Sequence, residues 1–313
     1  MDDVIKGPDV VIETRNLSKR YGSFTALSDV TISLKKGHIY GFIGENGAGK
    51  TTLLRIISGL SFQTSGELTL FGKSTRKEME QVRRHIGSTI EAPALYPDYT
   101  AMENLELERR LLGNPDRSIC GEMLALVGLS EAGRKKVKNF SMGMKQRLGI
   151  AVALLGKPHV LVLDEPVNGL DPKGITEIRG LLKKLNQEHG TTIMVSSHIL
   201  GELRLLATDY IIISQGKIVD ALSGEELEAK CRQYIAVRMD NVPLGLTVLE
   251  RGLTDVRYQV MEDGTVRIYS HVHAVADIAR LLQDNGVLVT GLNVSEQTLE
   301  DYYLRVTGGD GRD

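Results

Sequence analysis

The sequence is poor in the residue types that mark several protein classes. It has no tryptophan, and its two cysteines, Cys120 and Cys231, cannot form a disulfide framework, which predicts a reducing compartment. The 38 basic and 40 acidic residues leave a formal net charge of −2, whereas a nucleic-acid-binding protein normally needs a strongly basic face. The longest weakly polar stretch, residues 148–156, is far shorter than the roughly 20 residues of a membrane span. Residues 1–10 begin acidic without an apolar core, so we expect no secretory leader and a cytoplasmic protein.

Short β-type runs alternate with helical runs from residue 10 to about residue 223, which predicts an α/β fold. Two runs, Val160–Leu163 and Thr191–Val195, are apolar without alternation, as in parallel strands covered on both faces. No strand pattern occurs between about residues 99 and 156, so we expect a helical subdomain, about 92–157, inserted into the α/β body. The predicted strands are Val10–Leu17, Thr31–Leu34, Ile39–Ile43, Glu67–Phe71, Ile86–Ile90, Val160–Leu163, Thr191–Ser196, Tyr210–Ser214 and Lys217–Asp220; the helices of the insertion are Glu103–Leu112, Ile119–Val127 and Met142–Leu155.

The third inserted helix has clear end signals. Ser141 is a suitable N-cap, Gly156 stands where a left-handed residue would end the helix, and Pro158 follows as a stop.

The pattern changes beyond about residue 229 and predicts a small separate α+β domain, 229–307. A βαββαβ-like order followed by a helix is expected. Its elements are a strand at Tyr234–Met239, a helix at Leu244–Arg251, a hairpin of Val256–Val260 and Val266–Tyr269 around the turn 262–264, a helix at His273–Asn285, a strand at Val287–Val294 and a final helix at Leu299–Val306.

A glycine-rich segment after the strand Ile39–Ile43 predicts a phosphate-binding loop, or P-loop. It fits the pattern G-x-x-x-x-G-K-[ST] and precedes a helical run, which is the context this motif requires. Its backbone N–H groups and the following helix N-terminus can hold phosphates, Lys50 supplies a cation for them, and Thr51 supplies a hydroxyl for Mg²⁺. The residues are Gly44, Glu45, Asn46, Gly47, Ala48, Gly49, Lys50 and Thr51.

Two carboxylates, Asp164 and Glu165, follow the apolar strand Val160–Leu163. Ligands of a parallel sheet collect at the carboxyl ends of its strands, so Asp164 is a candidate for binding Mg²⁺. Glu165 is then the candidate general base that polarises the attacking water.

Further motifs make the chain resemble the ATP-binding subunits of ABC transporters over roughly residues 10–223. Asn139–Arg147 (NFSMGMKQR) resembles the signature sequence, Asn168–Asp171 the D-loop, and Ser196-Ser197-His198 the switch histidine. The resemblance implies a P-loop NTPase cassette, residues 10–228, with a RecA-like α/β core, an antiparallel β subdomain and the helical insertion.

The resemblance also implies site residues and a mechanism. Two such chains would form a head-to-tail homodimer that holds two ATP molecules, with Ser141 and Gly143 touching the γ-phosphate of the partner's nucleotide. The P-loop through Thr52 and the D-loop residue Asp171 would contact nucleotide, and Tyr21 would stack on adenine. His198 would bond the γ-phosphate and support the water-activating geometry around Glu165, so that ATP is hydrolysed to ADP and phosphate.

Glu91 departs from the family pattern, because most relatives have a glutamine after this strand. An ionised glutamate adds a negative charge and lacks a donor, so we expect it to strengthen Mg²⁺ binding. This glutamate and the signature resemble ATPases of exporters for bacitracin, lantibiotics and related peptides, including self-immunity systems. The segment 297–303 also resembles the ending of many drug-export ATPases.

We therefore expect the ATPase of a peptide-antibiotic exporter, which docks on a membrane-spanning permease at the inner face of the cell membrane. One alternative is a soluble ABC-type ATPase that acts on ribosomes or nucleic acid, although those relatives carry two cassettes or a long coiled-coil insertion. Another is a vestigial ATPase with a regulatory C-terminal module. Retention of Lys50, Asp164, Glu165 and His198 argues against the latter.

Overall fold

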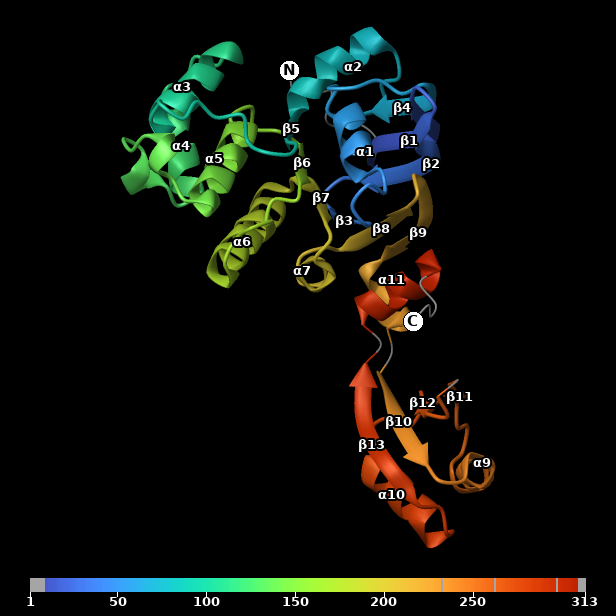
Figure 1. Cartoon of the computed structure of the whole chain (residues 1–313). Helices are drawn as coiled ribbons and strands as arrows, with labels where there is room; N and C mark the ends of the chain where they lie inside the picture. Colours follow the sequence, from blue (N-terminus) through green and yellow to red (C-terminus); the bar gives the residue numbers. More distant parts are fainter. Residues whose placement is uncertain (1–8, 232, 262, 297, 309–313) are drawn as a thin grey trace. The chain divides into compact units, whose positions relative to one another are not determined.

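The computed structural model describes residues 9–231, 233–261, 263–296 and 298–308, which fall into two compact units divided between residues 224 and 225 (Figure 1). Most of the acidic N-terminal segment, Glu262 of the expected hairpin turn, and Gln297 lie outside these ranges. The assignment of an ATP-binding domain to 10–228 and an accessory domain to 229–307 stays a prediction.

The first unit contains an antiparallel sheet of three strands in the order β2-β1-β4. Bulges make two of these strands longer than their apolar runs predicted. Asn16 and Asp29 adopt left-handed φ values of 47° and 53° where the register shifts. The third strand ends one residue early, since Phe71 also has a positive φ, 50°. The bounds are β1 (Val10–Tyr21), β2 (Phe24–Lys35) and β4 (Ser65–Leu70).

A second sheet of six strands, in the order β5-β6-β7-β3-β8-β9, confirms the α/β prediction. Its first five strands are parallel, and β9 pairs antiparallel to β8. All residues of β3, β6 and β7 are buried, which explains their unbroken apolar runs. The bounds are β3 (Ile39–Ile43), β5 (Ile86–Thr89), β6 (Val160–Asp164), β7 (Thr192–Ser197), β8 (Asp209–Ser214) and β9 (Lys217–Ser223).

Three helices of this unit, α3, α4 and α5, pack against one another and match the predicted insertion (Figure 1). Thr100 and Glu103 form a capping box at the start of α3. The helices are α1 (Lys50–Ile57), α2 (Arg76–Val82), α3 (Ala101–Leu111), α4 (Ser118–Leu126), α5 (Met142–Leu154), α6 (Pro172–His189) and α7 (Leu200–Arg204), with 3₁₀ turns at Arg83–His85, Ser130–Ala132 and Val137–Asn139.

The predicted ends of α5 are half right. The Ser141 hydroxyl accepts a hydrogen bond from the Met144 N–H and caps the helix as expected. The left-handed residue at the other end is Lys157, with φ 46°, and Gly156 does not have a positive φ. The reason is a tight final turn, in which the Lys157 N–H donates to the Leu154 carbonyl at 2.9 Å.

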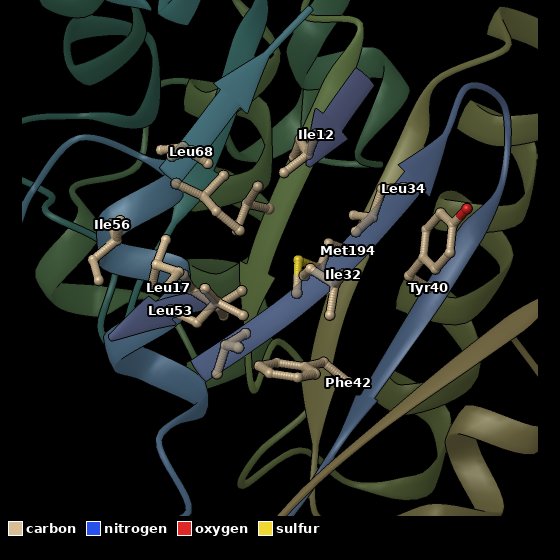
Figure 2. Close-up of a cluster of buried hydrophobic side chains, with 14 of the residues drawn as sticks. Ile12, Leu17, Ile32, Leu34, Tyr40, Phe42, Leu53, Ile56, Leu68 and Met194 are labelled. Atoms are coloured by element: carbon tan, nitrogen blue, oxygen red, sulfur yellow. The ribbon is translucent and has the colours of Figure 1, made fainter. Parts of the chain in front are cut away.

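The main core lies where the antiparallel sheet and α1 pack with the larger sheet (Figure 2). Phe42, Leu53 and Met194 come from β3, α1 and β7 and are fully buried. Burying each such side chain stabilises the fold by about 1.5–3 kcal/mol. This packing fixes β3 and α1, the two elements that flank the P-loop.

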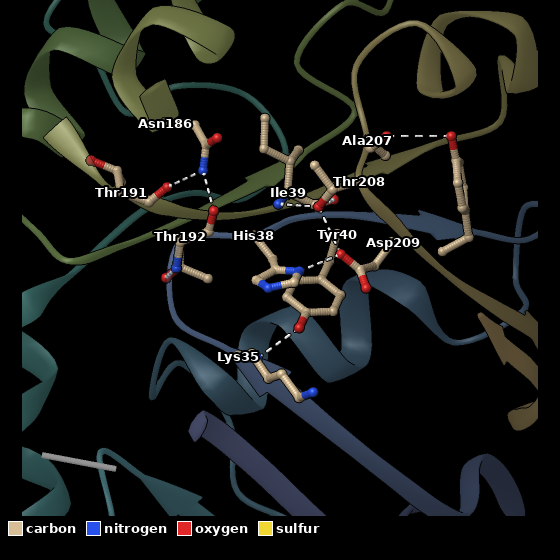
Figure 3. Close-up of polar contacts among 12 residues, drawn as sticks. Lys35, His38, Ile39, Tyr40, Asn186, Thr191, Thr192, Ala207, Thr208 and Asp209 are labelled. Atoms are coloured by element: carbon tan, nitrogen blue, oxygen red, sulfur yellow. Dashed lines mark hydrogen bonds and ion pairs between the residues drawn. The ribbon is translucent and has the colours of Figure 1, made fainter. Parts of the chain in front are cut away.

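Polar contacts hold β3 at its other end (Figure 3). His38 Nδ1 lies 2.6 Å from Asp209 Oδ2, and the Thr208 hydroxyl accepts from the Ile39 N–H at 2.9 Å. The Tyr40 hydroxyl accepts from the Lys35 N–H at 2.6 Å, and burial raises the pKa of Tyr40. The strand that leads into the P-loop is therefore fixed to β8 before it reaches the loop.

The second unit contains an antiparallel sheet in the order β11-β12-β10-β13, and its βαββαβ order and final helix were predicted. Ile235, Val266 and Leu282 belong to its separate buried cluster. Its first helix contains three glutamates, Glu225, Glu226 and Glu228. The bounds are α8 (Gly224–Lys230), β10 (Gln233–Met239), α9 (Val242–Gly252), β11 (Tyr258–Val260), β12 (Val266–Ile268), α10 (Val275–Asp284), β13 (Val289–Glu296) and α11 (Leu299–Thr307).

Candidate active site

The predicted P-loop connects β3 to α1. Gly47 and Gly49 have φ values of 84° and 108°, which L side chains rarely adopt. A Cβ on Gly49 would also lie 2.7 Å from the Ala26 carbonyl oxygen, so the loop packs against β2 at a distance that only glycine allows.

The turn between β8 and β9 also supports the loop. The Gly216 N–H donates to the Ala48 carbonyl at 2.9 Å, and the Gly216 carbonyl accepts from the Ser28 N–H at 2.8 Å. The backbone of the P-loop is therefore bonded, through residue 216, to β2.

The Lys50 side chain lies over this loop and is only 6% exposed. Its ammonium donates to the carbonyl oxygens of Gly44 at 2.5 Å and Glu45 at 3.1 Å. The lysine at the start of α1 thus places its charge inside the loop. Among the other loop residues, Glu45, Asn46 and Gly47 are exposed, Ala48 is buried, and Thr52 is half-buried in the first turn of α1.

Asp164, at the end of β6, is 5% exposed and is held on both carboxylate oxygens. The Thr51 hydroxyl donates to Oδ2 at 2.8 Å, and the Ser196 hydroxyl donates to Oδ1 at 2.5 Å. The structure therefore brings together the predicted P-loop threonine and the predicted metal-binding carboxylate.

Glu165 follows with a strained backbone, φ 49°, fixed by its own N–H, which bonds to Ser196 Oγ at 3.0 Å. Oε2 lies 2.8 Å from His198 Nδ1. Oε1 lies 3.6 Å from Lys50 Nζ, too far for a hydrogen bond, and among the described residues this buried oxygen has no donor. A buried acceptor without a donor is costly, so this atom fits a site where a water or ligand supplies the missing hydrogen.

A cavity of about 720 Å³ opens beside these groups, within the size range of ligand pockets. Thr51, Glu91, Asp164 and Glu165 lie on its wall together with residues from α5 and from the segment after β5. Four predicted site residues thus share one cavity, and Lys50 and His198 join them through direct contacts with Glu165.

Glu91 lies just beyond β5 and has a positive φ of 63°. Its Oε1 is 2.5 Å from the Arg55 guanidinium on α1. The carboxylate at the expected metal-binding position is therefore paired with an arginine in this structure.

Comparison with known proteins identifies the family to which this chain belongs. The sequence profile of the ABC transporter family matches residues 27–168. A bacitracin transport ATP-binding protein, BcrA of Enterococcus faecalis, is 41% identical over 305 residues, which are 97% of this chain and 98% of that protein. The chain belongs to the ABC transporter ATP-binding proteins.

Two further similarities agree with this family. The lantibiotic transport ATP-binding protein SrtF of Streptococcus pyogenes is 43% identical over 210 residues, 67% of this chain and 89% of that protein. A dimeric, post-hydrolysis structure of the ATP-binding cassette MJ0796 with ADP and Pi matches with a TM-score of 0.63 and 29% identity, over 68% of this chain and 98% of that one. The chain is thus an ABC-type ATPase that binds and hydrolyses ATP, as its sequence predicted.

Four other predicted site residues, Tyr21, Ser141, Gly143 and Asp171, are not among the residues that line this cavity. Tyr21 ends β1, and the Lys19 ammonium lies 4.8 Å from the centre of its exposed ring. Ser141 caps α5, with Gly143 in the first turn of that helix, and Asp171 caps α6 by accepting from the Gly174 N–H at 3.0 Å. The roles predicted for these residues in binding nucleotide stay predictions.

Sequence reasoning gave no role to two side chains that orient this site. Ser196 bonds both Asp164 and the Glu165 backbone, and Arg55 holds Glu91. The signal for Ser196 was its place at the end of the strand next to β6. Arg55 follows Thr51 by four residues on α1, which places the two on the same helix face.

No helix in the described parts of the chain is both long and apolar enough to cross a bilayer.

Proposed function

We propose that this chain powers the export of a peptide antibiotic as the ATPase subunit of an ABC exporter and so confers resistance or self-immunity. The observation that carries the cargo class is the 41% identity to a bacitracin transport ATP-binding protein, which extends over 97% of this chain and so includes the C-terminal unit. The similarity to a lantibiotic transport ATP-binding protein supports the same class.

The contacts around Glu165 support its proposed role as the general base. Oε1 is a buried acceptor with no hydrogen-bond donor among the described residues, and Glu165 lines the cavity. An attacking water in that cavity would supply the missing hydrogen bond. His198 fixes the other carboxylate oxygen and so orients the base. Lys50 would exchange its two carbonyl bonds for bonds to the phosphates of ATP, whose charge a buried ammonium stabilises.

The donor set beside the P-loop fits Mg²⁺. Thr51 and Asp164 offer hard oxygen atoms. The described residues contain no cluster of three acidic, histidine or cysteine side chains that could hold a metal by themselves. Mg²⁺ commonly uses one or two carboxylates and completes its coordination with phosphates and water. Thr51, Asp164 and Glu91 would hold the ion, which would neutralise charge on the β- and γ-phosphates of ATP.

Hydrolysis is proposed to require two copies of the chain. Only one P-loop motif is present, and Ser141 and Gly143 are not among the residues that line the cavity beside Glu165. In a head-to-tail homodimer they would instead contact the γ-phosphate held by the partner, with Asp171 near the same junction. The dimeric cassette that this chain resembles supports this arrangement.

Dilution tests the dimer. ATP hydrolysis per mole of protein should fall in proportion to protein concentration below the dissociation constant of the dimer, because each site is completed by the other copy. Turnover and light scattering would be measured on the same samples, with albumin added to prevent surface losses. Constant activity per mole in samples that scatter as monomers would refute a shared site.

Loss of the chain should sensitise its host to the cargo. The chain is proposed to act in the cytoplasm, bound to a membrane-spanning permease at the inner face of the membrane. Deleting its gene should lower the inhibitory concentration of bacitracin or of a lantibiotic, and the wild-type gene, but not one encoding Glu165→Gln, should restore it. An aminoglycoside serves as the control. Unchanged susceptibility to both peptides, with ribosomes rather than a permease in the purified complex, would refute peptide export.

A further inference from the structure

An ion pair joins the helix after the P-loop to the segment that leaves β5. Arg55 lies in the last turn of α1, and its Nη2 is 2.5 Å from Oε1 of Glu91. The two side chains are 40% and 59% exposed, so water can exchange around both partners. This pair is therefore accessible to displacement by another cation.

The pair lies next to the residues proposed to hold Mg²⁺. Thr51 and Arg55 are four residues apart and share one face of α1. Thr51, Glu91 and Asp164 line the same cavity. One carboxylate thus has a guanidinium on one side and the oxygen donors for a divalent cation within the same cavity.

The backbone of Glu91 indicates that its position is held by its surroundings. A φ of 63° is uncommon for a glutamate, and such a conformation persists where the surrounding structure holds it. The bond to Arg55 is one of the contacts made by this residue.

We propose that Arg55 is a positioning residue that competes with Mg²⁺ for the carboxylate of Glu91. The guanidinium holds Glu91 through a charge-assisted hydrogen bond. This bond offsets part of the negative charge of the carboxylate, so the same group attracts a divalent cation less strongly. Binding of Mg²⁺ with nucleotide releases Glu91 from α1, and by linkage the Arg55 pair weakens Mg²⁺ binding to the same degree. This inference rests on the proposed nucleotide and metal site.

Metal affinity tests the competition without relying on turnover. Mn²⁺ would replace Mg²⁺, with a non-hydrolysable ATP analogue, and free Mn²⁺ would be measured by electron paramagnetic resonance on the full chain. Arg55→Met should tighten Mn²⁺ binding about two- to fivefold, the range expected for loss of a solvent-exposed ion pair. Arg55→Lys, which keeps the charge but not the fork of donors, should fall between Arg55→Met and the wild type.

A matched variant and a second background separate competition from a general change in charge. Arg76→Met removes an exposed arginine that is paired with Glu80 on α2 and should leave Mn²⁺ affinity unchanged. In the Glu91→Gln background, Arg55→Met should have no effect, because the carboxylate for which the two cations compete is gone.

Each other outcome is decisive. If Arg55→Met tightens Mn²⁺ binding equally in the wild-type and Glu91→Gln backgrounds, Arg55 acts only through its positive charge, and the proposal is overturned. Unchanged Mn²⁺ affinity of Arg55→Met in the wild-type background also overturns it. If the wild-type chain shows no nucleotide-dependent Mn²⁺ binding, the proposed metal site itself fails, and the role of Arg55 fails with it.

Discussion

Glu165→Gln should lower ATP turnover by about 10²–10⁴-fold, the range for loss of a general base, and leave ATP binding intact. The amide keeps the size of the side chain but cannot take a proton from water at the position of Oε1. ATP-bound dimers should therefore accumulate. Rapid-quench measurement of a single turnover gives the rate, and size-exclusion chromatography with ATP reports the dimer.

Glu188→Gln is the matched control, because Glu188 is an exposed residue of α6 that pairs only weakly, at 3.9 Å, with Lys184. This variant should hydrolyse ATP at the wild-type rate. Wild-type turnover by Glu165→Gln would show that another group accepts the proton, and the assignment of the base would be wrong.

Lys50→Met should lose ATP affinity by about 10²–10⁴-fold, which corresponds to two charge-assisted hydrogen bonds at about 1.5–3 kcal/mol each. The ammonium is buried beside the loop, where it would exchange its bonds to two loop carbonyls for bonds to phosphate oxygens. Methionine keeps most of the apolar chain and removes the charge. Isothermal titration calorimetry with ATP measures the loss.

The exposed Lys184 on α6 supplies the control, since Lys184→Met removes the same charge away from the loop. It should bind ATP as the wild type does. The two site variants also differ from each other, because Lys50→Met fails at binding and Glu165→Gln fails after it. Retained affinity in Lys50→Met would show that the backbone N–H groups of the loop hold the nucleotide on their own.

The sequence predicted the buried parts of the fold well. Runs such as Val160–Leu163 are short and apolar on both faces, a pattern typical of a covered parallel strand. The P-loop followed from glycine and lysine at fixed spacing, because a loop that wraps phosphate tolerates few alternatives. In both cases the signal lies in residues that are close together in the sequence.

Features that depend on distant residues were not predicted. The extension of β1 to Tyr21 depends on pairing with β2 across bulges. Residues 18–21 are mostly polar and do not show the pattern of a strand. Arg55 and Glu91 are 36 residues apart, and only the placement of β5 brings the guanidinium to the carboxylate. The left-handed residue was predicted at Gly156 but lies at Lys157. A glycine near the end of a helix therefore predicts the region where the helix ends better than the exact residue.

The hydrogen bond from Gly216 to the P-loop limits how far the chain can be shortened from its C-terminal end. Three segments support one another, namely residues 26–28, residues 48–49 and residue 216. More than 160 positions separate residue 49 from residue 216 in the sequence. A fragment that ends before the β8–β9 turn would contain all residues of the P-loop motif but would lack the hydrogen bonds from Gly216 that support the loop. Truncated versions should consequently retain residues through 216 if they are to bind a triphosphate.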